Sequence, residues 1–233
     1  MALSDDLKSE VARIFKDSWS ERDGRVVPDA DDVALTNDAI NFKRATVLYA
    51  DLSGSTSMVQ KFKWQFAAEI YRTYLYCAAK LIRDSDGSVA AYDGDRVMGI
   101  FIGDYQSTNA VKCALKINFA VRNIINPAIK NQYSSTDFVV KQVVGIDTSA
   151  IRVARTGVRG HNDLVWVGRA ANYAAKLTEL NEGPETWITK DIFEKIAKDA
   201  KYGGKPETLM WKKWTWSKMD KYEIYSSTWT WRI

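Results

Sequence analysis

The sequence predicts an α+β sandwich, in which a central, largely antiparallel sheet is flanked by helices. Two observations support this fold class. Helical patterns alternate with pairs of strand-like segments along most of the 233 residues. In addition, Asp93-Gly94 lies between two β-rich runs, which is a strong signal for a tight hairpin and therefore for antiparallel pairing. The length suits one large domain, or one domain with a short appendage.

The first 42 residues differ in pattern from the rest of the chain. Residues 3–15 place five apolar side chains on one helical face: Leu3, Leu7, Val11, Ile14 and Phe15. A polar stretch from Asp17 to Asn41 follows, with Gly24, Pro28 and several aspartates. We therefore expect an N-terminal helical arm and connector over residues 1–42, and a globular domain over residues 43–233.

From residue 43 onward, strand and helix patterns follow one another with little interruption. We expect, in order, a buried strand at 44–52, a helix at 57–83, hairpin strands at 88–92 and 96–102, a helix at 109–125, strands at 137–148 and 151–156, a helix at 169–180 and paired strands within 210–231. The segment Asn181-Glu182-Gly183-Pro184 is typical of a helix end.

The composition argues against several classes of protein. The 33 Lys and Arg against 29 Asp and Glu give a net charge of +4, which is too small to indicate nucleic acid or a membrane surface as a partner. No apolar run approaches the roughly 18 residues of a membrane span, and the acidic N-terminus does not resemble a signal peptide. Cys77 and Cys113 fit buried reduced thiols. We expect a cytoplasmic protein.

Nine tryptophans stand against a single histidine. One histidine excludes a His-rich metal site and argues against a catalytic triad. Four of the tryptophans alternate at strand period near the C-terminus: Trp214, Trp216, Trp229 and Trp231. We expect these rings to cover the late strands and to pack against the core or the N-terminal arm, rather than to stack on bases as in single-strand nucleic-acid binders.

Two aspartates lie where a predicted strand meets a turn. Asp51 ends the strand at 44–52, and Asp95 follows the Asp93-Gly94 turn. Oxygen ligands without His or Cys nearby select Mg²⁺ or Mn²⁺. The turn Ser53-Gly54-Ser55-Thr56 then opens a helix, whose N–H groups favour an anion. Together these features predict a metal–triphosphate site, although turn and cap roles for both aspartates remain an alternative.

Four segments resemble, in order, the motifs of class III nucleotidyl cyclases. The first two are the metal motifs, Val47-Leu48-Tyr49-Ala50-Asp51-Leu52-Ser53-Gly54-Ser55-Thr56 and Ala91-Tyr92-Asp93-Gly94-Asp95-Arg96-Val97-Met98. The strand Val144-Gly145-Ile146-Asp147-Thr148 is similar to the one before the dimer arm of the family. The helix Val167-Gly168-Arg169-Ala170-Ala171-Asn172-Tyr173-Ala174-Ala175-Lys176-Leu177 resembles their Asn/Arg helix.

The resemblance implies a homodimer with its active sites across the interface. Asp51 and Asp95 of one subunit are then expected to bind two Mg²⁺ or Mn²⁺ ions, with help from the Leu52 carbonyl. The partner is expected to contribute Asn172 and Lys176, which helical i,i+4 spacing places on one face. The implied reaction is attack of the ribose 3′-OH on the α-phosphorus of a nucleoside triphosphate, with loss of pyrophosphate.

Two basic positions of the family are occupied by lysine in this sequence. Lys176 stands where the family usually has Arg, so the charge is kept but the forked hydrogen bonding is lost. The triphosphate-binding Lys that the family carries in its late strands aligns best with Lys218, and next best with Lys221.

The residues that read the base depart from the purine-specific members of the family. Adenylate cyclases have Lys at the position of Ala91 and Asp or Thr at the position of Val165, and neither residue here can hydrogen-bond a base. Tyr49 replaces the usual Phe, and Arg96 directly follows the second metal aspartate. The bulky Tyr49 ring makes the base pocket smaller, and a smaller pocket with guanidinium donors suits a pyrimidine with carbonyl oxygens.

This pattern resembles the pyrimidine cyclases of bacterial anti-phage (Pycsar) systems, whose cyclic nucleotide switches on a separate effector protein. It implies a uridylate cyclase that makes cyclic UMP from UTP, with a cytidylate cyclase that makes cyclic CMP as the alternative. A catalytically inactive nucleotide-binding homologue and a purine cyclase with a rebuilt pocket also remain open. Tyr49 as a core aromatic and Arg96 as a surface ion pair are the structural alternatives.

Overall fold

Two long strands run the length of the molecule and form the spine of its sheet. They are β2 (Asp38–Ser53) and β5 (Lys141–Val158), which pair antiparallel from Ala39 to Ser53 with one irregularity between Phe42 and Ala45. The computed structural model describes residues 2–180 and 183–233. Within that part of the chain, every other strand of the main sheet attaches, directly or through a neighbour, to this pair.

The main sheet is largely antiparallel, as predicted. Its other strands are β1 (Ser20–Asp23), β3 (Ser88–Asp93), β4 (Arg96–Phe101), β6 (His161–Val167), β7 (Thr186–Thr189), β10 (Lys212–Trp216) and β11 (Tyr222–Ser227). The order is β10-β11-β7-β5-β2-β4-β3, with β1 on β2 and β6 on β5. Only the β1–β2 and β5–β7 pairs are parallel among the described strands. A small hairpin, β8 (Tyr202–Gly203) and β9 (Thr208–Leu209), stands apart.

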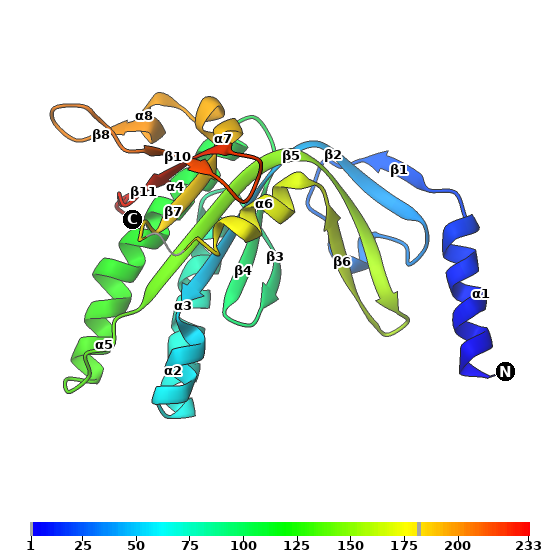
Figure 1. Ribbon diagram of the computed structural model, residues 1–233, viewed down its shortest axis with the longest axis horizontal. Helices are drawn as coiled ribbons and strands as arrows, with labels where there is room; N and C mark the ends of the chain where they lie inside the picture. The colour runs from blue at the N-terminus through cyan, green and yellow to red at the C-terminus, as the bar shows by residue number, and fades with distance from the viewer. Residues whose placement is uncertain (1, 181–182) are drawn as a thin grey trace.

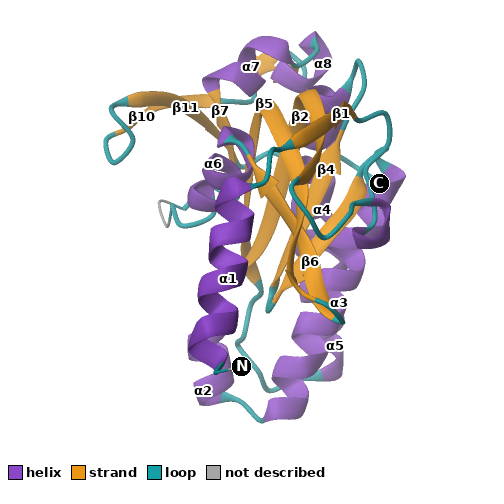
Figure 2. Cartoon of the chain, turned by 90° about the vertical axis from the view of Figure 1, so that its right-hand side faces the viewer, coloured by secondary structure: helices purple, strands orange, loops and turns teal. Residues whose placement is uncertain are grey.

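Helices cover both faces of the sheet. The helices of the described chain are α1 (Leu3–Lys16), which stands apart from the body (Figure 1), η1 (Ala30–Asp32), α2 (Ser55–Lys61), α3 (Trp64–Asp84), α4 (Gln106–Ala120), the π-helical turn η2 (Val121–Ile125), α5 (Asn126–Gln132), α6 (Arg169–Leu177), α7 (Lys190–Lys195) and α8 (Lys198–Lys201). Figure 2 shows α6 on one side of the sheet and α3, α4 and α5 on the other.

Successive side chains of β2 point to opposite faces of the sheet, so this strand contributes to a separate core on each face. Leu48, Ala50 and Leu52 pack with α3 and α4 in the larger cluster of buried apolar side chains. Val47 points the other way, into a second cluster that includes alanines of α6, and Tyr49 packs at its edge. The strand that was predicted at 44–52 therefore separates two cores, which explains its nearly continuous apolar sequence.

The ends of the two long strands leave the body and form a smaller sheet, which we call the wing. It consists of β1, residues 38–42 of β2, residues 151–158 of β5, and β6. Figure 1 shows the wing to one side of the body, with α1 beyond it. β2 begins before the predicted domain start at residue 43, because Ile40 and Phe42 alternate into a buried cluster with Val33 and Trp166. The division at residue 42 stays a prediction.

Several predicted boundaries were wrong. The helix predicted at 57–83 is two helices, α2 and α3. The strands predicted at 137–148 and 151–156 are one continuous strand, β5, because it must serve both body and wing. The helix predicted at 169–180 ends at Leu177, and Asn181 and Glu182 of its expected end lie outside the described residues. Within 210–231, β10 and β11 pair as predicted, but residues 228–231 form no strand.

The C-terminal tryptophans are scaffold, and they pack on the body rather than on the N-terminal arm. Trp229 and Trp231 lie against the larger core, and the Trp231 backbone N–H donates to the Leu115 carbonyl at 2.9 Å. Trp216 is buried edge-on to Tyr173 of α6. The two chain ends lie on opposite sides of the molecule in Figure 1. Among the described residues, no helix combines the length and apolarity that crossing a bilayer requires.

Candidate functional site

The two predicted metal aspartates meet at one end of the β2–β4 pair. Asp51 lies near the end of β2, directly opposite Arg96, the first residue of β4. Asp95 precedes Arg96 in the β3–β4 turn. The tight hairpin therefore carries the second carboxylate to the first, although 43 residues separate them in the sequence.

The electrostatics of this pair fit a divalent cation. Burial, and then the neighbouring Asp95 carboxylate, raise the pKa of Asp51 from 3.8 to about 6. Asp95 Oδ2 is buried without a hydrogen-bond partner. A buried carboxylate oxygen that no protein donor satisfies is costly unless a cation neutralises it. No group of three or more His, Cys, Asp or Glu side chains gathers for a metal among residues 2–180 and 183–233, so substrate oxygens would have to complete the coordination.

A small cavity of about 250 Å³ opens beside Asp51. It is lined by Asp51, Leu52, Ser53, Gly54, Thr178 and Glu179. Gly54 adopts a positive φ of 76°, a conformation that favours glycine, and it directly precedes α2. Ser55 and Thr56, which were predicted to contact an anion, therefore form the first turn of α2. This turn follows the end of β2 that carries Asp51, which we call the metal end.

The predicted base-reading residues Tyr49 and Arg96 are in contact. The Arg96 guanidinium carbon lies 5.1 Å from the centre of the Tyr49 ring. The same guanidinium forms an ion pair with Asp93 at 2.5 Å. Burial acts to lower the pKa of Arg96, but Asp93, Asp51 and Tyr49 together more than offset it and raise the pKa, so Arg96 stays charged. Tyr49 therefore packs at the edge of an apolar cluster and beside a fixed cation, and Arg96 forms an ion pair with the exposed Asp93, as the structural alternative for Arg96 expects.

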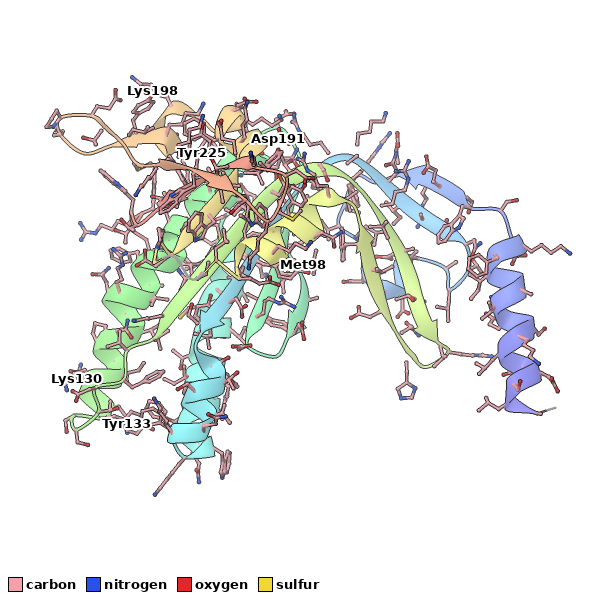
Figure 3. The ribbon with its side chains drawn as sticks, viewed as in Figure 1. Met98, Lys130, Tyr133, Asp191, Lys198 and Tyr225 are labelled. Atoms are coloured by element: carbon pink, nitrogen blue, oxygen red, sulfur yellow. The ribbon has the colours of Figure 1, made fainter. Side chains whose placement is uncertain are left out.

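Ala91 and Val165 lie on strands that are not neighbours. Ala91 on β3 is opposite Met98 of β4, a residue labelled in Figure 3, and Met98 is in turn opposite Tyr49. Val165 belongs to β6 of the wing, and 41% of it is exposed. Within one chain, therefore, the structure brings Ala91 to the Tyr49–Arg96 cluster but leaves Val165 on the wing.

Asn172 and Lys176 are exposed on the outer face of α6. The inner face packs closely on the sheet: a Cβ on Gly145 of β5 would come within 2.1 Å of the Ala174 carbonyl oxygen. Lys176 Nζ lies 3.8 Å from Met219 Sδ, in the β10–β11 turn that also carries the exposed Lys218. Thr178 and Glu179, rather than Asn172 or Lys176, line the cavity at Asp51.

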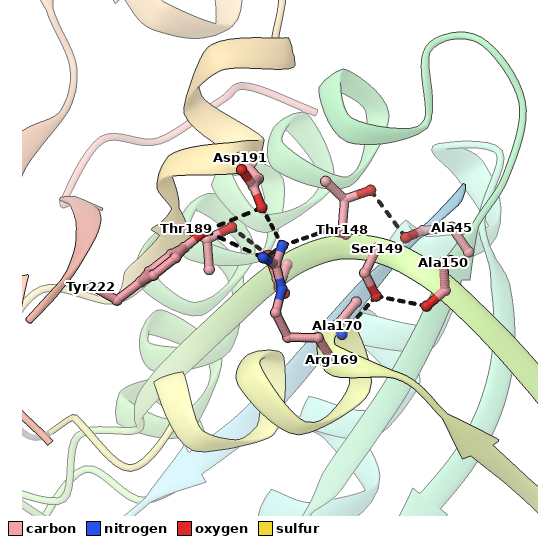
Figure 4. A network of polar contacts seen from close by, with 10 residues as sticks. Ala45, Thr148, Ser149, Ala150, Arg169, Ala170, Thr189, Asp191 and Tyr222 are labelled. Carbon is pink, nitrogen blue, oxygen red and sulfur yellow. Dashed lines mark hydrogen bonds and ion pairs between the residues drawn. The ribbon is translucent and has the colours of Figure 1, made fainter. Parts of the chain in front are cut away.

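Arg169, the first residue of α6, ties this helix to the sheet through a charged network (Figure 4). Its guanidinium forms an ion pair with Asp147 of β5 at 3.0 Å and with Asp191 of α7, and donates to the Thr148 carbonyl at 2.9 Å. Asp147 is fully buried and also accepts a hydrogen bond from Thr189. Burial raises the pKa of Asp147, and its two partners only partly offset this.

The ion pairs that position the site were not predicted from the sequence. Asp93 pairs with Arg96, and Asp147 pairs with Arg169. Asp147 carried a signal, because an acidic residue that directly follows the apolar run Val143–Ile146 within a buried strand requires a partner for its charge. Asp93 was treated only as a turn residue, although opposite charges three residues apart across a hairpin can pair.

A larger cavity of about 440 Å³ lies between α4, η2 and β5 and shares Ser53 with the cavity at Asp51. Its buried amides already bond to one another: Gln142 donates to Asn118 at 2.6 Å, and Asn118 donates to Thr186 at 3.0 Å. The carboxylates that fit a cation therefore lie at the smaller cavity and not among these amides.

The chain is similar to curated proteins over its whole length. It is 52% identical to a uridylate cyclase of Burkholderia cepacia over 234 residues, and 49% identical to a uridylate cyclase of Xanthomonas perforans over 234 residues, with 100% of both chains covered in each case. A third relative, the uridylate cyclase of Rhodovulum sp. (strain MB263), is 35% identical over 100% of this chain and 98% of the relative. No protein-family model matches the sequence.

Solved structures share the fold at low identity. The guanylyl cyclase Cya2 superposes with a TM-score of 0.68 at 17% identity, over 82% of this chain and 93% of that one. The adenylyl cyclase CyaB from P. aeruginosa gives a TM-score of 0.66 at 19% identity, over 81% and 95% of the two chains. These similarities establish the α+β sandwich of cyclase domains as the fold.

Removing the charge of Asp51 is expected to stabilise the metal-free protein. Because the folded pKa of about 6 exceeds the ordinary value of 3.8, stability falls as pH rises through that window and stays lower above it. After discounting for solvent screening, the cost is roughly 1–2 kcal/mol, so Asp51→Asn should raise the melting temperature by about 2–6 °C at pH 8 in EDTA and by little at pH 4. Thermal unfolding at both pH values measures this, with the exposed Asp104→Asn as control. An unchanged or lower melting temperature at pH 8 contradicts it.

Arg169→Gln is expected to destabilise the fold, because it leaves the Asp147 carboxylate buried without its cation. The expected loss is about 3 kcal/mol or more of unfolding free energy, measured by urea denaturation. Arg152→Gln removes an exposed pair with Glu21 and should cost less than about 1 kcal/mol. Adding Asp147→Asn to Arg169→Gln should recover part of the loss. Equal costs for the two arginine variants would show that the network does not hold α6.

Proposed function

This chain belongs to the uridylate cyclases, within the class III nucleotidyl cyclases, and from that premise we propose that it converts UTP to 3′,5′-cyclic UMP and pyrophosphate. The observation that carries the proposal is the Arg96 guanidinium, held by Asp93 and Tyr49 next to the Asp51–Asp95 pair. It places fixed hydrogen-bond donors for a base beside carboxylates suited to a triphosphate-bound cation.

Asp51 and Asp95, with the Leu52 carbonyl, hold two Mg²⁺ or Mn²⁺ ions in this proposal. When bound, such ions neutralise the triphosphate and lower the pKa of the ribose hydroxyl. Gly54, Ser55 and Thr56 bring backbone N–H groups to the phosphates. The Asp95 oxygen that lacks a protein donor is the feature of this chain that favours such a cation.

The remaining groups come from a second copy of the chain. Asn172 and Lys176 face outward, while the C-terminal end of α6 lines the cavity at Asp51 of its own chain. One chain therefore holds both halves of the site, pointed in different directions, and a homodimer would contain two complete sites. Asn172 orients the ribose, Lys176 and Lys218 contact the phosphates, and the O3′–Pα bond forms as the bond from Pα to the pyrophosphate oxygen breaks.

The base preference follows from the donors of Arg96. Uracil presents carbonyl oxygens at O2 and O4, whereas cytosine carries an amino group at position 4 that cannot accept a hydrogen bond. Asp93 fixes the direction of the guanidinium, and the Tyr49 ring fills space that a purine would need. Ala91 and Val165 offer no group that reads adenine. CTP, which shares O2 with UTP, is the second candidate substrate.

The product acts, in our proposal, as a second messenger of anti-phage defence, read by a separate effector protein. The support is the resemblance of Tyr49 and Arg96, with Ala91 in place of Lys, to pyrimidine cyclases of such systems. Lys176, in place of the usual Arg, favours one alternative, a protein that binds the nucleotide without turning it over.

Incubation with each of the four nucleoside triphosphates and Mn²⁺ or Mg²⁺, followed by mass spectrometry of the product, tests the proposal. We expect cyclic UMP as the main product, at a rate at least tenfold above any other. Asp51→Ala should abolish it, while the control Asp104→Ala should not. Faster cyclisation of ATP or GTP contradicts pyrimidine specificity, a preference for CTP selects the cytidylate alternative, and an inactive wild type selects the binding protein.

Arg96→Gln is expected to lower kcat/KM for UTP by roughly 10- to 100-fold, since a charge-assisted hydrogen bond contributes about 1.5–3 kcal/mol. Asp93→Asn should have a smaller effect in the same direction, mainly on KM, because the guanidinium loses its fixed orientation. Tyr49→Phe removes only the hydroxyl, so it tests the contribution of the hydroxyl separately from that of the ring. The exposed Arg83→Gln serves as the matched control. If Arg96→Gln lowers turnover of UTP and of ATP by the same factor, Arg96 does not read the base.

A further inference from the structure

A cleft of about 740 Å³ lies where the wing joins the body, and we call it the junction cleft. Its wing side consists of residues 23–25, at the end of β1, and residues 41–44 of β2. Its body side consists of residues 102–104 and Gln106, between β4 and the start of α4. Figure 1 shows β1 on the wing and α4 in the body. A volume of this order suits a small molecule.

The junction cleft is separate from the site at Asp51. Arg44 and Asp51 both belong to β2, and the extended strand between them places their backbones about 23 Å apart. Among the described residues, the cavity at Asp51 and the junction cleft share none. A ligand of the junction cleft is therefore not in contact with the metal end.

Gln106, the first residue of α4, is a buried polar side chain that lines this cleft. It is only 3% exposed, and its Oε1 has no hydrogen-bond partner within the described chain. A buried polar atom without a partner costs free energy unless a ligand supplies the missing bond. A hydroxyl group both donates and accepts hydrogen bonds, so a hydroxyl can satisfy this amide.

The start of α4 is open to an anion. No described side chain caps this helix of 15 residues, and its first turn contains no acidic residue. The free N–H groups of a first turn attract negative charge. The hydroxyls of Thr46 and Ser107 form a buried hydrogen bond at 3.1 Å, which holds this turn against β2, two residues along the strand from Arg44.

Three cationic side chains line the junction cleft: Arg25, Lys43 and Arg44. Lys43 is paired with Asp23 at 3.3 Å. Arg25 and Arg44 are exposed, and neither forms an ion pair or a side-chain hydrogen bond inside the part of the chain that the structure describes. The planar guanidinium group matches the geometry of phosphate oxygens, so both arginines are available to bind a phosphate group.

Two carboxylates, Asp23 and Asp104, also line the cleft. Besides its pair with Lys43, Asp23 accepts a hydrogen bond from the Asn41 side chain at 3.4 Å. Asp104 is exposed. Three cations against two carboxylates leave only a modest positive charge, so the cleft favours a ligand with one phosphate group over a triphosphate.

The backbone that carries Arg25 is held in place by β2. The Gly24 N–H donates to the Asn41 carbonyl at 2.9 Å. A Cβ on Gly24 would come within 2.6 Å of the Ile40 and Phe42 side chains, so this backbone packs directly on the strand. Arg25 is therefore positioned before a ligand arrives, which lowers the cost of ordering the site on binding.

We propose that the junction cleft binds a phosphate monoester that carries hydroxyl groups, of the size of a pentose phosphate or a nucleoside monophosphate. Its phosphate contacts Arg25, Arg44 and the first turn of α4, and one of its hydroxyls bonds to the Gln106 amide. This site requires neither the second copy nor the metal ions of the proposed function.

A bound ligand also restricts the wing relative to the body. The β2–β5 ladder is irregular between Phe42 and Ala45, so Lys43 and Arg44 have no partner in the described part of β5. The cleft thus contains the unpaired segment at which the wing leaves the body. Because Arg25 follows a strand of the wing and Gln106 begins a helix of the body, a ligand that contacts both connects the two parts.

The first experiment is isothermal titration calorimetry of the full-length protein with inorganic phosphate, ribose, ribose 5-phosphate and AMP. EDTA is present, so that no divalent cation bridges a phosphate to Asp51. We expect ribose 5-phosphate to bind at least tenfold more tightly than inorganic phosphate, and ribose not to bind. Tighter binding of AMP than of ribose 5-phosphate identifies a nucleoside monophosphate as the ligand, and equal or weaker binding of AMP identifies a pentose phosphate. Failure of both esters to bind more tightly than inorganic phosphate overturns the proposal.

The second experiment tests the residues. Arg25→Gln/Arg44→Gln should raise the Kd for ribose 5-phosphate at least tenfold, whereas the exposed pair Arg83→Gln/Arg232→Gln is the matched control and should leave it unchanged. Equal effects of the two double variants contradict the assignment of the phosphate site.

Gln106→Leu tests the hydroxyl contact separately. It should raise the Kd for ribose 5-phosphate at least fivefold and change the Kd for inorganic phosphate less than twofold. Because the substitution removes a buried oxygen that lacks a partner, the melting temperature should not fall. Equal weakening of both ligands, or of neither, shows that Gln106 does not bind a hydroxyl. The arginine variants change only exposed side chains, so they remain informative if Gln106→Leu does not fold.

Hydrogen–deuterium exchange locates the bound ligand. Saturating ribose 5-phosphate should slow exchange in residues 42–46 and 103–108, on the two sides of the cleft, and leave α6 unchanged. Protection confined to residues 51–56 places the phosphate at the metal end instead. That result removes the junction site and leaves the proposed function intact, whereas loss of cyclase activity without loss of ribose 5-phosphate binding does the reverse.

Discussion

The antiparallel ladder between β2 and β5 is the interaction on which the rest of the structure depends. It starts beside the metal end, where Ser53 is paired with Lys141, and it reaches the wing, where Ala39 is paired with Ala154. A shift of one residue would turn every side chain to the opposite face. Asp51 would then point toward the core face that Leu48 and Ala50 now occupy, and Gly145 would no longer lie under α6. The register of this ladder therefore determines where Asp51 points, where α6 packs and where the wing lies.

The two acidic clusters of the body differ in how far neighbouring groups compensate their negative charge. Asp147 is fully buried, yet it has Arg169 and Thr189 as partners, so its charge contributes to holding α6 in place. Asp51 and Asp95 lie close together with weaker compensation: Arg96 and the Thr178 hydroxyl only partly offset the burial of Asp51, whose pKa is raised, and one oxygen of Asp95 has no donor. A buried carboxylate without full compensation lowers the stability of the fold. Such a group is typical of a site that binds a ligand or reacts.

The sequence predicted local features of the site better than its long-range contacts. Asp51 and Asp95 could be found because a strand end and a hairpin turn are short-range patterns. The Arg169 network joins β5, α6 and α7, and such contacts depend on packing that periodicity does not encode. The two halves of the 57–83 helix were merged, since apolar spacing continues across the break. The course of β2 into the wing was missed, because residues 17–41 are polar and their pairing strand lies more than 100 residues away.

In the proposed function the catalytic groups are divided between two surfaces, so activity requires a dimer. Within one chain, α6 presents Asn172 and Lys176 outward, while its last turn lies by Asp51 of the same chain. The inner face of α6 cannot rotate to reverse this, because Ala174 is packed on Gly145 and Arg169 is bound to Asp147. Rigid attachment of α6 therefore keeps Asn172 and Lys176 turned away from Asp51 of the same chain. In the proposed dimer, the same rigidity would hold Asn172 and Lys176 of the second copy in a fixed geometry, so the Arg169 network would support both the stability of the chain and the activity of the dimer.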